Sequence, residues 1–173
     1  MLKCNPDAPQ LPVRRLALAE GKVVYMAVPR LRDEKPFLWL AEDATIKARG
    51  ARPLAVEELE PVDLVVCGTV AVNRDGVRVG KGGGYSDLEF GLLVEAGLVA
   101  DATTIATTVH PLQLLDGDLP ETEHDFRVDV IVTPKETLRT PHRRRPPGIL
   151  WSHLTPEKTA AIPVLASRTG SGA

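Results

Sequence analysis

A glycine-rich segment in the middle of the chain most constrains the fold. It runs Arg78-Val79-Gly80-Lys81-Gly82-Gly83-Gly84-Tyr85-Ser86-Asp87, with two cations near its start and a carboxylate at its end. Glycine has no Cβ, so neighbouring backbone N–H groups can turn toward one anion and approach it closely. A helical pattern begins directly after the glycines, which places them at a helix N-terminus, where unpaired N–H groups favour anions. The segment therefore indicates a phosphate-binding loop between a strand and a helix.

A simple turn between a strand and a helix is the alternative, because a single glycine motif is weak support for a ligand site. The spacing is not that of a Walker A loop, since Gly76 lies one residue too close to Gly80-Lys81 and Gly82 replaces the Ser or Thr that binds magnesium. It is not the dinucleotide fingerprint G-x-G-x-x-G either. The residues alone leave a phosphate site and a turn about equally open.

Strand-like and helix-like segments alternate along the chain. Residues 62–70 form a continuous apolar run of strand length, typical of the buried middle of a parallel sheet. We expect further strands at 22–28, 77–79, 103–109 and 128–132, and helices at 55–59 and 87–99. This alternation predicts an α/β fold with a mainly parallel sheet. Ligands of such sheets bind at the carboxyl ends of the strands, which is where the glycine segment falls.

Composition is that of an ordinary globular chain. A length of 173 residues fits a domain with a substantial core. The chain has 21 Lys and Arg against 23 Asp and Glu, and this net charge of −2 argues against general nucleic-acid binding, which needs a basic face. No apolar run approaches the roughly 20 residues of a membrane span, and the start lacks a signal-peptide core, so we expect a cytoplasmic protein without a membrane partner. Cys4 and Cys67 lie far apart, and no disulfide is expected.

The end of the chain has a different character. We expect a nucleotide-binding α/β domain over residues 1–140, followed at 141–173 by a basic, proline-rich linker, a short helix and a tail. A solvated connector and a contact with phosphate or RNA both remain open for the linker at 141–148. Thr155 and Pro156 are typical of the N-cap and first position of a helix. The apolar residues 162–165 are expected to dock on the domain.

The glycine segment resembles the signature of the 5-formyltetrahydrofolate cyclo-ligase (methenyltetrahydrofolate synthetase) family. The similarity lies in Gly80-Lys81-Gly82-x-Gly84-Tyr85-x-Asp87, preceded by Arg78. A second similar block follows downstream, made of Gln113, Leu119-Pro120, Glu123-His124-Asp125 and residues 128–134. The resemblance covers approximately residues 22 to 134, and residues 28–32 and 84–90 are most similar to the methenyltetrahydrofolate-synthetase-domain-containing branch. It implies a three-layer α/β/α fold with a mainly parallel sheet.

The resemblance also implies an activity and a set of site residues. The implied reaction is an ATP- and Mg²⁺-dependent ligation that turns 5-formyltetrahydrofolate and ATP into 5,10-methenyltetrahydrofolate, ADP and phosphate. Its ATP-binding residues would be Arg78, Gly80, Lys81, Gly82, Gly83, Gly84, Tyr85 and Ser86. Lys81 and Arg78 would also be catalytic, because phosphoryl transfer depends on positioning and charge neutralisation. Asp87 and Asp125 would hold magnesium and should therefore meet in one cleft beside the loop.

Departures from the family pattern keep a second hypothesis open. Ser86 stands where most members carry a second aromatic ring, which weakens stacking on a pterin. Gly83 and Leu88 likewise replace a Lys and a frequent Arg. Family chains usually begin with a helix that bears a Lys and an Arg, and residues 1–9 contain two prolines instead, so we expect this helix to be missing. The alternative is a non-catalytic nucleotide-binding or interaction module that keeps the cyclo-ligase fold.

Overall fold

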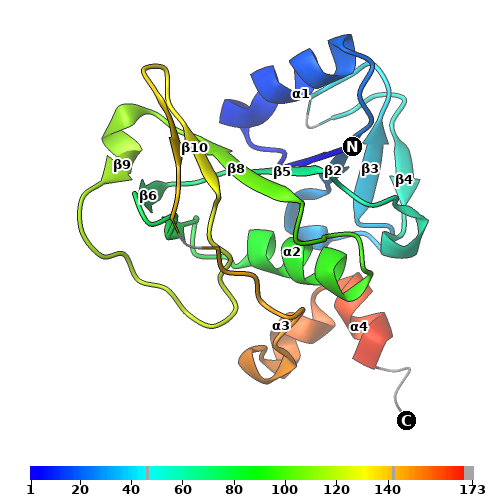
Figure 1. Cartoon of the computed structure of the whole chain (residues 1–173). Helices are drawn as coiled ribbons and strands as arrows, with labels where there is room; N and C mark the ends of the chain where they lie inside the picture. The colour runs from blue at the N-terminus through cyan, green and yellow to red at the C-terminus, as the bar shows by residue number, and fades with distance from the viewer. Residues whose placement is uncertain (46, 142, 170–173) are drawn as a thin grey trace.

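An eight-stranded sheet forms the centre of the computed structural model, which describes residues 1–45, 47–141 and 143–169 (Figure 1). The strand order is β11-β10-β8-β5-β1-β2-β3-β4. The strands are β1 (Leu2–Cys4), β2 (Val24–Ala27), β3 (Phe37–Leu40), β4 (Arg52–Leu54), β5 (Leu64–Cys67), β8 (Thr104–Thr108), β10 (Val130–Val132) and β11 (Thr137–Arg139). The run from β10 to β2 is parallel, and the pairs β10–β11, β2–β3 and β3–β4 are antiparallel. The predicted α/β fold with a mainly parallel sheet is confirmed.

Helices cover both faces of the sheet, so the structure has the predicted three layers (Figure 1). Helix α1 (Leu11–Ala19) lies on one face, and α2 (Tyr85–Glu95) lies on the other with α3 (Pro156–Ala160) and α4 (Pro163–Thr169) beyond it. Short 3₁₀ turns join these elements at Ala8–Gln10, Pro29–Leu31, Val56–Glu58, Pro111–Gln113 and Trp151–His153. No described helix combines the length and the apolar character that crossing a membrane requires.

Alternating side chains of the strands divide the core into two clusters. In β2, Tyr25 and Ala27 belong to the cluster that contains α2, whereas Val24 and Met26 belong to the cluster that contains Ala17 of α1. Successive side chains of a strand point to opposite faces, so a strand covered by helices on both sides must be apolar at every position. This requirement explains the continuous apolar runs seen in the sequence.

The predicted strands are found, whereas the helix expected at 55–59 is only the 3₁₀ turn Val56–Glu58. The strand expected at 77–79 forms β7 (Arg78–Val79), which belongs to a second, three-stranded sheet with β6 (Ala71–Asn73) and β9 (Leu114–Leu115). Helix α2 ends before the expected residue 99 because Gly97, at φ 69°, and Leu98 donate back to its last carbonyls. The sequence did not predict β1, the strand between β5 and β2, because Lys3 interrupts its apolar character.

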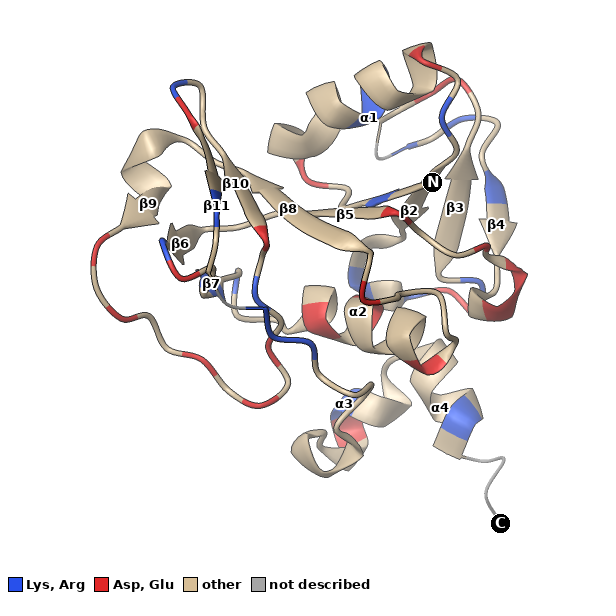
Figure 2. Cartoon of the chain, in the orientation of Figure 1, with Lys and Arg blue, Asp and Glu red and all other residues tan. Residues whose placement is uncertain are grey.

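The C-terminal residues share the core of the domain. Ile149, Ile162, Val164 and Leu165 are buried in the same cluster as α2, as expected for 162–165. The linker arginines pair with carboxylates of the body: Arg143 and Arg145 with Asp129, and Arg144 with Glu121. Figure 2 shows the basic linker as a blue stretch between β11 and α3. His142 of the predicted linker lies outside the described residues.

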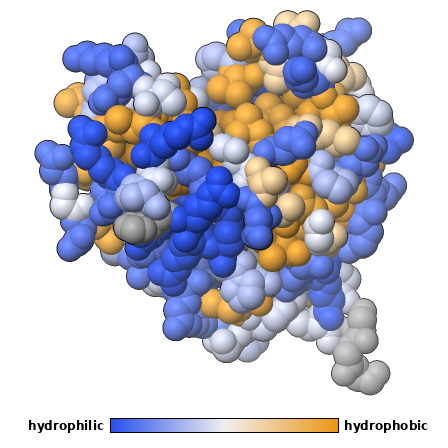
Figure 3. Space-filling view, in the orientation of Figure 1, coloured by the Kyte–Doolittle hydropathy of each residue, from blue (hydrophilic) through white to orange (hydrophobic). Residues whose placement is uncertain are grey.

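In Figure 3, hydrophilic residues form a band across the middle of the visible face, with apolar patches on either side.

Candidate functional site

The glycine loop connects β7 to α2 and depends on left-handed backbone at two positions. Gly82 has φ 83° and Gly84 has φ 66°, values that a residue with a Cβ adopts only with strain. Gly84 is the N-cap of α2, and no side chain caps this helix end. The first N–H groups of α2 are therefore free of side-chain acceptors, which is the arrangement that binds an anion at a helix N-terminus.

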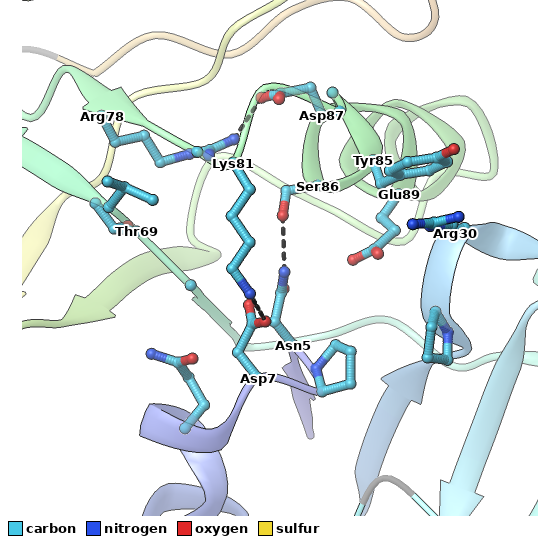
Figure 4. A pocket seen from close by; sticks show the side chains of 18 of the residues that line it. Asn5, Asp7, Arg30, Thr69, Arg78, Lys81, Tyr85, Ser86, Asp87 and Glu89 are labelled. Atoms are coloured by element: carbon cyan, nitrogen blue, oxygen red, sulfur yellow. Dashed lines mark hydrogen bonds and ion pairs between the residues drawn. The ribbon is translucent and has the colours of Figure 1, made fainter. Parts of the chain in front are cut away.

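A cavity of about 410 Å³ lies beside this loop (Figure 4). Its other walls follow the carboxyl ends of parallel strands: Asn5 comes directly after β1, Pro29 comes soon after β2, and Gly68 comes directly after β5. This position agrees with the expectation for ligand sites in α/β sheets. Gly68 allows a close approach, because a Cβ there would lie 2.2 Å from Oδ2 of Asp7.

Most of the predicted site residues line this cavity. Those that do are Arg78, Gly80, Lys81, Gly83, Gly84, Tyr85, Ser86 and Asp87. Gly82 does not line it, and its left-handed backbone serves the turn of the loop. Asp125 does not line it either, and lies in the segment before β10.

Ion pairs hold the two predicted catalytic cations. The guanidinium of Arg78 pairs with Asp87, and the two side chains are only 3% and 11% exposed. Arg78 also lies 3.9 Å from the ring centroid of Phe126, a cation–π contact that fixes its direction. Lys81 is 76% exposed, and its Nζ reaches Oδ1 of Asp7 at 2.6 Å (Figure 4). Sequence reasoning missed Asp7, which comes from the loop after β1.

The two predicted magnesium ligands are close enough to interact electrostatically. Burial raises the pKa of Asp87, the Arg78 guanidinium opposes this rise, and the charge of Asp125 adds to it. Oδ2 of Asp125 accepts from the backbone N and the hydroxyl of Thr122, at 2.6 Å and 2.8 Å. Within the described ranges, no cluster of three or more His, Cys, Asp or Glu residues is arranged to hold a metal. Two carboxylates suit magnesium, which keeps several waters and takes its remaining ligands from phosphates.

A second, smaller cavity of about 70 Å³ lies behind the loop. Gly84 and Asp87 line both cavities, and the other walls of the smaller one include His124, His153 and Lys158. The Nδ1 atoms of the two histidines are 3.1 Å apart. Segments before β10 and after residue 148 thus meet behind the glycine loop.

A buried ion pair supports the floor of the large cavity. Lys3 of β1 pairs with Glu89 of α2, which lines the cavity, and Lys3 Nζ also donates to Asn5 Oδ1 at 2.8 Å. Asn5 in turn donates to Ser86 Oγ at 2.7 Å. Ser86, which stands where the family carries an aromatic ring, is therefore part of a polar network. Sequence reasoning missed Lys3 and Glu89 because their positions differ by 86.

Arg14 holds the loop after β1 in place. It is 1% exposed and donates to four backbone carbonyls, those of Asn5, Pro6, Asp7 and Ala44. These bonds satisfy buried acceptors that a short loop could not satisfy by itself. Arg14 thereby fixes the loop that carries the partner of Lys81.

The layers and the cavity define a class: three-layer α/β proteins with a ligand cleft at the carboxyl edge of a parallel sheet. Residues 1–134 match the 5-formyltetrahydrofolate cyclo-ligase family. The chain belongs to this family, and the resemblance seen in the sequence is confirmed.

Individual relatives agree with this assignment. The chain is 39% identical to "Methenyltetrahydrofolate synthase domain-containing protein" of Mus musculus, in an alignment that covers 95% of this chain and 48% of the relative. Identity to the protein of the same name from Bos taurus is 37%, over 96% of this chain and 47% of the relative. "5-formyltetrahydrofolate cyclo-ligase, mitochondrial" of Arabidopsis thaliana is 31% identical over 55% of this chain and 36% of the relative. The chain spans about half the length of the first two relatives.

Proposed function

We propose that this chain binds ATP with Mg²⁺ and catalyses a 5-formyltetrahydrofolate cyclo-ligase-like reaction. In this reaction the formyl oxygen attacks the γ-phosphate of ATP, and ADP leaves. The phosphate then leaves as the second folate nitrogen closes the ring, which gives 5,10-methenyltetrahydrofolate. The observation that carries the proposal is the cavity itself, in which a glycine loop, a helix N-terminus and two cations converge in a member of this family.

The residues of the loop would position the phosphates. The backbone N–H groups of residues 80–84 and the start of α2 supply donors without side-chain competition. Lys81 is exposed and would exchange its contact with Asp7 for one with a phosphate. Arg78 is already fixed by Asp87 and Phe126, so its charge is preorganised toward the loop and costs little reorganisation during the reaction.

Asp87 and Asp125 would hold the magnesium ion. Asp87 lies at the boundary of both cavities, and the charge of Asp125 acts on it. Bound magnesium would neutralise charge on the phosphate oxygens. A cation would also relieve the repulsion between the two carboxylates, which is the physical reason to place them near each other.

The part of the cavity away from Arg78 would receive the folate-like substrate. Tyr85, Arg30 and Glu89 lie together on this side (Figure 4). The Tyr85 ring offers a face for stacking, and the two charged groups offer a donor and an acceptor.

A non-catalytic module that keeps the fold is the second candidate function. The observation that favours it is the polar network around Ser86, because a hydrogen-bonded serine replaces an aromatic ring at the substrate side. Such a module would bind ATP through the loop without turnover.

The test is formation of methenyltetrahydrofolate by the purified chain with 5-formyltetrahydrofolate, ATP and Mg²⁺, followed by the absorbance of the product. We expect turnover that requires all three components and falls at least about 100-fold in Lys81→Met, the size expected when one transition-state contact is lost. Lys135→Met, in the turn between β10 and β11, is the matched control. ATP binding by calorimetry without any turnover would select the module, and absence of both would refute the proposed site.

A further inference from the structure

The C-terminal segment, residues 149–169, lies outside the part of the chain that matches the family. That match ends at residue 134. The alignments with the methenyltetrahydrofolate synthase domain-containing proteins of mouse and cattle cover 95% and 96% of this chain, so they include most of this segment. The segment is therefore a feature that this chain shares with those relatives and that the family match does not explain.

The C-terminal segment packs directly on α2, the helix that follows the glycine loop (Figure 1). Gly91 in the middle of α2 permits this, because a Cβ there would lie 3.0 Å from Cγ1 of Ile149. A glycine inside a helix costs about 0.5–1 kcal/mol relative to alanine. The close packing of Ile149 against α2 explains why the helix has a glycine here. The backbone N of Ile149 also donates to Oε1 of Glu95 at 3.1 Å. The segment is thus held at a fixed place behind the loop.

One side chain of this segment reaches the glycine loop itself. Lys158 lies in α3, where Thr155 caps the helix by accepting from the Lys158 backbone N at 3.2 Å. Its half-buried side chain donates from Nζ to the carbonyl oxygen of Gly83 at 2.8 Å. The same Nζ lies 5.6 Å from the ring centroid of Tyr85, and a Cβ on Gly84 would lie 3.3 Å from it.

This contact fixes the orientation of one peptide unit in the loop. In a trans peptide the C=O and the N–H point in opposite directions. A carbonyl of Gly83 held toward Lys158 therefore turns the N–H of Gly84 away from Lys158. Without that contact the unit could rotate, because glycines on both sides of it remove the usual steric limits.

We propose that Lys158 is a positioning residue of the nucleotide site, and that the C-terminal segment serves to hold it there. This inference rests on the proposed ATP binding. Lys158 sets the Gly83–Gly84 peptide unit so that its N–H is preorganised for a phosphate, and its charge adds to the positive potential of the loop. The glycines give the loop its close approach to an anion, and the lysine restores the rigidity that the glycines remove.

Calorimetry with ATP and Mg²⁺ on the full chain tests the effect on binding. Lys158→Met should raise the Kd for ATP about 10-fold, the size expected for a lost hydrogen bond from a charged group. Lys158→Arg keeps the charge and the donor, and should recover most of this loss. Lys135→Met, which removes an exposed lysine in the turn between β10 and β11, should leave Kd unchanged. Equal Kd values for wild type and Lys158→Met would overturn the proposal.

Amide hydrogen exchange without ligand tests the positioning separately. Lys158→Met should speed exchange about fivefold or more at the amide of Leu88, which donates to Gly84 O in the first turn of α2, while the amides of α4 keep their protection. Unchanged exchange at Leu88 would overturn the positioning role even if ATP binds. Failure of the wild-type chain to bind ATP, with exchange altered as expected, would instead refute the proposed function and leave a role for Lys158 in ordering the loop. Faster exchange throughout α4 would show that Lys158 serves general folding, which also contradicts the proposal.

Discussion

The ion pair between Lys3 and Glu89 joins the central strand β1 to α2 beneath the cavity. Its side chains are 2% and 5% exposed. Removal of one partner leaves the other charge buried without compensation, which costs about 3–5 kcal/mol. We therefore expect Lys3→Met to lower the free energy of unfolding by about 3–5 kcal/mol, a large part of the roughly 5–15 kcal/mol of a typical domain.

A double variant separates charge from packing. Lys3→Met combined with Glu89→Leu removes both charges and keeps similar side-chain volumes, so most of the loss should return, to within about 1 kcal/mol of wild type. Urea unfolding measures each free energy. The matched control is the exposed pair of Lys35 and Glu58, whose side chains are 52% and 43% exposed at an N–O distance of 2.9 Å. Lys35→Met should cost less than about 1 kcal/mol.

Two results would refute this reasoning. If Lys3→Met costs no more than Lys35→Met, Glu89 keeps its hydration from the cavity that it lines, and its burial imposes no penalty. If the single and double variants lose the same stability, packing around Lys3 decides the loss and the unpaired charge does not.

Two further predictions concern other carboxylates. Asp87→Asn and Asp125→Asn should each remove the magnesium dependence of ATP binding in calorimetry, and retention of that dependence in either variant would contradict the metal site. A hydrogen bond from Arg127 holds the pKa of Glu121 below its usual value. This contact therefore stabilises the fold fully above about pH 4.5, the pKa of a glutamate in the unfolded chain. The stabilisation is lost as the pH falls through the lowered pKa that Glu121 has in the folded chain. Glu121→Gln should thus cost about 1–2 kcal/mol at neutral pH, and a loss that persists unchanged below about pH 4 would contradict the assignment.

Local sequence patterns predicted the fold class correctly because a strand that is buried on both faces can be recognised from its own residues. A parallel strand between two helical layers must be apolar on both faces, as residues 64–67 of β5 are. The same patterns missed β1, whose Lys3 looks like a surface residue until its partner on α2 is known. The sequence also left the role of the linker at 141–148 open, because its arginines contact Asp129 and Glu121 only in the folded chain.

The sequence likewise predicted one part of the candidate site and missed another. Its glycines, its cations Arg78 and Lys81, and its position before a helix were all visible in one continuous segment. The partners of that segment were not, because Asp7 lies 74 positions from Lys81 and Lys158 lies 75 positions from Gly83. Whether Asp87 and Asp125 share one magnesium ion stays a prediction.

The sequence by itself determined where an anion can approach, since the absence of Cβ atoms and the order of strand, loop and helix are local properties of the chain. Only the tertiary structure decided which charges face the loop and which are neutralised. Burial makes a charge costly without a partner, and the chain supplies that partner from any element that the fold brings within reach. Lys3 with Glu89 and the half-buried Lys158 with Gly83 are two such contacts between distant segments.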